Sequence, residues 1–204
     1  MSNKHRPWKT RLYAATSLDG LLARANNDIT WLTQPPSDPD HTTPSTPRQT
    51  PTFEDHIAEV DFIVMGRVTF EVCCSFPQWP YPERKILVLS ETLEHLPNTA
   101  PQGARIVRSI HGVEKILNDE GAKMVYVDGG KITRDFLRRG WVDEMVLTLA
   151  PVLLGAEGGR GSSLFGFGVE DGETGLNADM RFTLLGVDVI ENGMVSCWYR
   201  VTGA

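Results

Sequence analysis

Apolar runs alternate with segments of helical periodicity along most of the chain. Runs that are apolar throughout predict strands buried on both faces, as in a parallel sheet. The expected strands are 11–17, 62–65, 85–90, 104–107, 124–127 and 144–151. Apolar residues at helical spacing predict helices over 53–60, from Gly66 to about 75, over 111–120 and from Gly130 to about 140. This alternation predicts an α/β fold with a mostly parallel, doubly wound sheet.

The chain closes with a different pattern. Two apolar stretches, 181–190 and 194–201, flank Glu191, Asn192 and Gly193. Asn-Gly between two apolar strands is a strong signal for a tight antiparallel hairpin. We therefore expect a C-terminal antiparallel hairpin at the edge of the sheet.

Two segments show neither helical nor strand periodicity. Residues 34–52 are rich in Pro and Thr and predict an exposed loop insertion. Residues 155–175 hold eight glycines, which is typical of a flexible loop that closes over a substrate. The DITWL segment is not expected to form a helix. Neither the 34–52 segment nor the 155–175 segment interrupts the alternation of strands and helices enough to divide the chain, so we expect one domain over 1–204.

Composition narrows the function classes. With 41% hydrophobic residues, a net charge of −6 and a pI near 5.4, the chain is globular and lacks the basic face that nucleic acids require. Three cysteines form no even disulfide set, which favours a reducing, cytoplasmic setting. No signal peptide or membrane span is expected, and five scattered histidines predict no metal site. Small-molecule chemistry is the best default.

Two strand-to-helix junctions carry the most specific chemistry. The first contains Gly66, Arg67 and Thr69, and the second contains Gly129 and Gly130. The first N–H groups of a helix have no intrahelical partner, and the helix dipole favours an anion there. Two such junctions in one domain indicate a bound dinucleotide. The glycines alone are also compatible with a tight turn, and Arg67 with a surface ion pair.

Several segments together carry a family resemblance. They occur in the order YAATSLDGLLA, DITWL, FIVMGRVTFE, QWPY, KILVLSETL, KMVYVDGGKITRDFL, VDEMVLTLAPVLLGAEG and SLFG. This order resembles the dihydrofolate reductase-like fold, and most closely the RibD C-terminal family of riboflavin-biosynthesis reductases. The resemblance implies an NADPH-dependent reductase that acts on a small molecule, and often a homodimer.

The resemblance also implies roles for individual residues. Those assigned to the cofactor are Gly66, Arg67 and Thr69 at the adenosine and phosphate half, Ser90 at the adenosine ribose, Gly129, Gly130, Lys131, Ile132 and Thr133 at the pyrophosphate, and Ala15 beside the nicotinamide. Many relatives carry a basic residue after the serine, where this chain has Glu91. A carboxylate there would repel a 2′-phosphate, so NADH also stays open.

On the substrate side, Asp19, Ser17 and Glu157 are candidate proton donors by position. Asp19 is favoured, although Asp-Gly is also a common turn. Ser17, Trp31 and Phe53 are predicted to line the substrate, and core packing is the alternative for Trp31 and Phe53. The substrate implied by the family is 5-amino-6-(5-phosphoribosylamino)uracil or another small heterocyclic, carbonyl or imine compound. Dihydrofolate reduction is an alternative, weakened because the family spacing places Thr50 where an acid is expected. A non-catalytic nucleotide-binding module is the other alternative.

Overall fold

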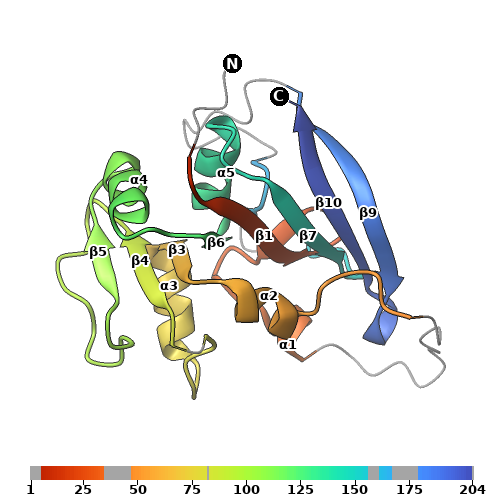
Figure 1. Cartoon of the computed structure of the whole chain (residues 1–204). Coiled ribbons are helices and arrows are strands. Elements are labelled where there is room, and N and C mark those ends of the chain that lie inside the picture. Colours follow the sequence, from red (N-terminus) through yellow and green to blue (C-terminus); the bar gives the residue numbers. More distant parts are fainter. Residues whose placement is uncertain (1–5, 35–46, 82, 156–160, 167–178, 204) are drawn as a thin grey trace.

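The computed structural model describes residues 6–34, 47–81, 83–155, 161–166 and 179–203. Eight strands form one sheet in the order β5-β4-β3-β6-β1-β7-β10-β9 (Figure 1). Their bounds are β1 Lys9–Thr16, β3 Phe62–Gly66, β4 Lys85–Leu89, β5 Arg105–Val107, β6 Met124–Asp128, β7 Glu144–Leu149, β9 Arg181–Val189 and β10 Val195–Gly203. In this spatial order the first six strands, β5, β4, β3, β6, β1 and β7, are parallel to one another. Strand β10 runs antiparallel to both β7 and β9. The predicted mostly parallel sheet with an antiparallel C-terminal hairpin is confirmed.

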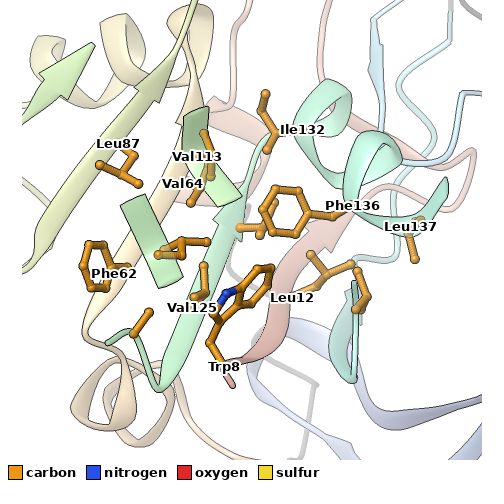
Figure 2. Close-up of a cluster of buried hydrophobic side chains, with 14 of the residues drawn as sticks. Trp8, Leu12, Phe62, Val64, Leu87, Val113, Val125, Ile132, Phe136 and Leu137 are labelled. Carbon is orange, nitrogen blue, oxygen red and sulfur yellow. The ribbon is translucent and has the colours of Figure 1, made fainter. Parts of the chain in front are cut away.

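Helices pack on both faces of this sheet. Helices α4 (Ile110–Asp119) and α5 (Gly130–Arg138) contribute Val113 and Phe136 to the larger core cluster, which also holds Trp8 from the N-terminal segment (Figure 2). Helices α2 (Phe53–Glu59) and α3 (Arg67–Ser75) pack on the opposite face, in a second cluster. Helices on both faces make the sheet doubly wound, as predicted. Alternate residues of each central strand point to opposite faces and so reach both clusters.

The carboxyl ends of the three central strands form the edge where a ligand is expected. Strand β1 lies between β6 and β7, and β6 lies between β1 and β3. Met65 of β3 is paired in register with Asp128 of β6. The two glycine junctions therefore follow neighbouring strand ends.

Three short elements differ from the sequence prediction. Residues Thr30–Thr33 form one helical turn, α1, where no helix was expected. Strands β2 (Leu21–Ala23) and β8 (Ser162–Ser163) form a separate two-stranded sheet within segments predicted as loops. A Cβ on Gly161 would lie 2.1 Å from the Ala23 carbonyl oxygen, so glycine permits this close pairing. The rest of the predicted closing loop, 156–160 and 167–178, lies outside the described residues.

The C-terminal hairpin turns where Asn-Gly predicts it. Asn192 and Gly193 both have positive φ, 58° and 71°, which these two residue types tolerate best. Asp188 on the edge strand β9 accepts hydrogen bonds from the backbone of Gln49 and Thr50. Most of the predicted insertion, residues 35–46, lies outside the described residues, but its last part is held to the sheet. In the described part of the chain, no helix is long and apolar enough to cross a bilayer.

Candidate functional site

Two helix N-termini meet at the carboxyl edge of the sheet. Gly66 precedes α3 and Gly129 precedes α5, and neither N-cap residue makes a side-chain capping bond. The first-turn N–H groups of both helices therefore lack the side-chain acceptor that usually satisfies one of them. The Thr69 side chain touches the second junction, since a Cβ built on Gly129 would lie 2.3 Å from Thr69 Oγ1. The two anion-attracting helix ends are thus adjacent, as a dinucleotide site requires.

The glycines at the second junction also have structural tasks. Gly129 has φ +96° and ψ 144°, a conformation that side-chain-bearing residues rarely adopt. A Cβ on Gly130 would meet the Ser163 carbonyl oxygen at 2.4 Å. Gly66, by contrast, has an ordinary extended conformation with φ −81°. The tight-turn reading therefore holds for Gly129, whereas Gly130 permits the close approach of Ser163. Both uses are compatible with anion binding, because glycine places no side chain in front of the helix N-terminus.

The structure distinguishes side-chain from backbone roles among the other predicted cofactor residues. Arg67 is half-exposed and pairs with Glu71 one helical turn later, at 2.9 Å. Ile132 and Thr133 are only 3% and 1% exposed, so they can offer a ligand only their backbone. Lys131 is exposed at the first turn of α5. Arg67 and Lys131 are thus cationic side chains at these two helix starts, and the Arg134 guanidinium also lies close to Gly130, where it donates to the Ser163 carbonyl oxygen.

Ser90 follows β4 and is bound into its own turn. Its Oγ accepts hydrogen bonds from the N–H groups of Thr92 and Leu93. Arg108 also braces this turn, because its guanidinium donates to the carbonyl oxygens of Ser90 and Leu93. The turn is rigidly held, and the exposed Glu91 lies within it.

At the end of β1, the predicted cofactor residue Ala15 and the predicted substrate residue Ser17 have different environments. Ala15 is partly exposed, as a residue beside a cofactor ring needs to be. Ser17 is fully buried, and its Oγ accepts the Leu21 N–H at 3.0 Å. The prediction that Ser17 contacts substrate finds no support, because its hydroxyl stabilises the turn that leads into β2.

The Asp19 carboxylate is likewise committed to hydrogen bonds with the backbone. Its two carboxylate oxygens accept the N–H groups of Leu154 and Gly155, each at 3.1 Å. Hydrogen bonds, foremost from Ser17, lower the pKa of Asp19, so the carboxyl stays ionised. A group that must donate a proton near neutral pH needs the opposite shift. Asp19 therefore anchors the loop after β7, and its predicted role as proton donor loses its support.

The two predicted aromatic contacts have different environments. Trp31 is 8% exposed and packs with Ala150 and Leu154, so it belongs to a third core cluster and does not wall an open site. Phe53, at the start of α2, is partly exposed and packs against Tyr13 and Tyr81, with ring centroids 5.6 and 6.3 Å away. Phe53 therefore packs at the margin of the second core cluster, with part of its side chain exposed.

Sequence reasoning missed the acid best suited to hold a proton. Asp128 ends β6, directly before Gly129, and is half-buried. The Tyr81 hydroxyl donates a short hydrogen bond to its Oδ2. Burial raises the pKa of Asp128 and raises the pKa of Tyr81 as well. An acid directly before paired glycines was the available signal, whereas Tyr81 comes from a distant loop.

These features define an α/β protein of the dihydrofolate reductase-like fold. A model of the RibD C-terminal domain matches residues 83–196, more than half of the chain, and the chain belongs to this family. A crystal structure of a protein provisionally assigned to riboflavin biosynthesis in Shewanella sp. PV-4 is 29% identical, has a TM-score of 0.74, and is matched over 95% of this chain and 99% of that one.

Further relatives extend the comparison. The uncharacterised protein YwjB of Bacillus subtilis is 27% identical over 154 residues, covering 72% of this chain and 79% of its own. RibD of Acinetobacter baumannii shares the fold at 18% identity and a TM-score of 0.63. This match covers 96% of the present chain and only 58% of that RibD.

Proposed function

We propose that this protein is an NAD(P)H-dependent reductase of the RibD C-terminal type. The observation that carries the proposal is the pair of adjacent helix N-termini at Gly66 and Gly129, neither with a side-chain cap. Family membership and the reductase names of two structural relatives support the same class. One such relative, from Thermotoga maritima, is named a diaminohydroxyphosphoribosylaminopyrimidine deaminase and 5-amino-6-(5-phosphoribosylamino)uracil reductase.

The residues present fit a dinucleotide. The helix N-termini of α3 and α5 would hold its phosphates, with Arg67 and Lys131 as cationic side chains beside them. Ala15, partly exposed at the end of β1, leaves room for the nicotinamide. When bound, the nicotinamide supplies hydride chemistry. The protein's own contribution is to align the reacting carbon and to deliver a proton.

Asp128 is the proposed proton donor. Its raised pKa keeps a share of the carboxyl protonated closer to neutral pH than an ordinary aspartate. The hydrogen bond from Tyr81 fixes the orientation of the carboxyl. Asp128 ends β6, which lies between β3 and β1 in the sheet, and this position supports the proposal because the proposed phosphate and nicotinamide subsites lie at the ends of those two strands.

Dihydrofolate reduction remains the second candidate reaction, and the structure adds little to it. Thr50, at the position where that reaction expects an acid, is buried and donates through Oγ1 to Asp188 at 2.6 Å. Asp188 Oδ2 also accepts the Thr50 N–H at 2.7 Å. This carboxylate is committed to holding the chain, so it does not replace the missing acid.

The cofactor site is tested by fluorescence titration with NADPH and NADH, in the native protein and in Arg67→Ala. We expect saturable NADPH binding that is weakened about tenfold in the variant, because a charge-assisted hydrogen bond to phosphate is lost. Arg105→Ala is the matched control, since Arg105 is a similarly exposed arginine whose ion pair with Glu120 lies elsewhere on the sheet. Tighter NADH binding would show that Glu91 sets the preference, and failure of both nucleotides to bind would refute the proposal.

The proton donor is tested by Asp128→Asn with substrates of both candidate reactions. We expect turnover to fall by about 10² to 10⁴ while the NADPH dissociation constant is unchanged. Tight NADPH binding by the native protein without turnover of any pyrimidine, imine or folate substrate would instead favour a non-catalytic nucleotide-binding module.

A further inference from the structure

An open cleft lies beside the proposed cofactor site. It has a volume of about 580 Å³ and separates the 26–34 segment from the exposed face of α3. Val68, between Arg67 and Thr69 in the chain, lies on its wall. The cleft therefore adjoins the first helix N-terminus, where the proposed dinucleotide binds, and it is large enough for the part of a substrate that does not react.

The wall of the cleft has two chemically distinct parts. Val68, Val72 and Phe76 form an apolar strip along α3. Val68 is 43% exposed, so its side chain is free to contact a ligand in the cleft. Amide and hydroxyl side chains from the 26–34 segment face this strip from the other side. A ligand with one flat or aliphatic part and several polar groups would match both parts.

The charged groups on the wall are of one sign. Asp28 and Glu71 both line the cleft, and the residues that the structure places on its wall include no Lys or Arg. Each carboxylate has an arginine partner four residues away, Arg24 for Asp28 and Arg67 for Glu71, and neither arginine lines the cleft. A phosphate that entered the cleft would therefore meet two carboxylates.

We propose that this cleft receives a protonated amine attached to an apolar ring or chain, and that the substrate of this reductase carries such a group in place of a phosphate. The inference rests on the proposed function for its assignment to a substrate, while the ligand class follows from the cleft itself. The carboxylates of Asp28 and Glu71 bind the ammonium group, and the Val68, Val72 and Phe76 strip contacts the apolar part.

Arg67 couples this cleft to the cofactor. In the present structure one Arg67 nitrogen donates to both carboxylate oxygens of Glu71, at 2.9 and 3.0 Å. A cofactor phosphate at the start of α3 would compete for the same guanidinium. Glu71 would then lose its counter-charge and attract an ammonium group more strongly. Cofactor binding is thus expected to precede and strengthen amine binding.

Three probes that differ only in charge test the proposal: benzylamine, benzyl alcohol and benzyl phosphate. Binding is followed by shifts in the backbone amide NMR signals of residues 26–34 and 68–76 on titration. We expect benzylamine to bind with a millimolar dissociation constant. Benzyl alcohol should bind several-fold more weakly, and benzyl phosphate at least about tenfold more weakly, because each half-exposed carboxylate contributes up to about fivefold.

Glu71→Gln should weaken benzylamine binding about fivefold and leave benzyl alcohol binding unchanged. Its matched control is Asp119→Asn, which removes a carboxylate from another exposed i,i+4 ion pair, with Lys115 on α4. Asp28→Asn is a second variant, but Asp28 also accepts the Thr30 N–H at the start of α1, so its folding must be verified.

Preference for benzyl phosphate, equal binding of all three probes, or no shift of the cleft signals would each overturn the proposal. These outcomes are separate from those of the cofactor titration. A protein that binds benzylamine in the cleft but binds neither NADPH nor NADH would refute the proposed function and retain the ligand class.

Discussion

Gly129→Ala is expected to be among the more destabilising alanine substitutions in this protein. The residue occupies φ +96°, ψ 144°, next to a region that is almost confined to glycine, and an alanine there costs about 1 to 3 kcal/mol of backbone strain. The new Cβ would also lie 2.3 Å from Thr69 Oγ1 and 3.4 Å from Thr69 Cβ. Relief of that overlap requires a shift of α3 or of the Thr69 rotamer, at about 1 to 3 kcal/mol more.

The two contributions can be separated because one atom causes the clash. Thr69→Ala removes Oγ1, and the remaining contact of 3.4 Å is ordinary van der Waals distance. The double variant should therefore recover the packing contribution and retain the backbone strain. Gly121→Ala is the matched control, since Gly121 has φ +65° with nothing within 4 Å of an added Cβ. It should cost only about 1 kcal/mol.

Urea unfolding of the four variants and the native protein measures these differences. We expect Gly129→Ala to lose about 4 kcal/mol in total and to melt roughly 8 to 16 °C lower, given 2 to 4 °C per kcal/mol for a chain of this size. Equal stability of Gly129→Ala and Gly121→Ala would refute the clash. If Thr69→Ala failed to recover any stability in the Gly129→Ala background, the adjacency of the two junctions would be wrong.

Two further predictions concern titratable groups whose pKa is shifted by burial. His56 is fully buried, and neither ring nitrogen has a hydrogen-bond partner among the described residues. Burial lowers the pKa of His56 to about 3. The unfolded chain therefore takes up a proton below about pH 6.5 that the folded protein excludes. Stability should therefore fall by up to about 1.4 kcal/mol per pH unit as pH drops from about 6.5 towards 3, and acid titration of His56→Phe should lack this share of the slope. The pKa of Asp128 is raised in the folded state, so the native protein should lose stability as pH rises through the range above about 4. Asp128→Asn should consequently be more stable than the native protein at pH 7 in urea unfolding, and the gain should vanish below about pH 4; a constant gain at all pH values would contradict the shift.

The main elements could be predicted because their signals are local. The uninterrupted apolar run that ends at Gly66 specifies a strand buried on both faces, and Asn192-Gly193 specifies a tight reversal. Strand β8 has only two residues and pairs with β2 far away in the chain, so no periodicity announces it. Helix α1 is a single turn whose start is fixed by Asp28, through the Thr30 N–H and hydroxyl.

The site was less predictable because roles depend on partners from elsewhere in the sequence. Asp19 and Asp128 are both acids beside glycine, and the sequence favoured Asp19. Only the structure shows that Asp19 accepts two backbone N–H groups some 135 residues away, whereas Asp128 is paired with a tyrosine hydroxyl 47 residues away. The role of Ser17 was unpredictable for a similar reason. Its position at the end of β1 was predicted, but the burial that argues against contact with substrate was not.

The place of β1 in the sheet has a consequence for how the protein folds. This strand is formed by residues 9–16, yet its two neighbours are β6 and β7, which begin at Met124 and Glu144. During synthesis more than a hundred residues must therefore be added after β1 before either partner strand exists. Such long-range pairing slows folding and leaves apolar strand edges exposed in the meantime. Newly made chains should therefore depend on chaperones more than chains of equal length with local strand pairing.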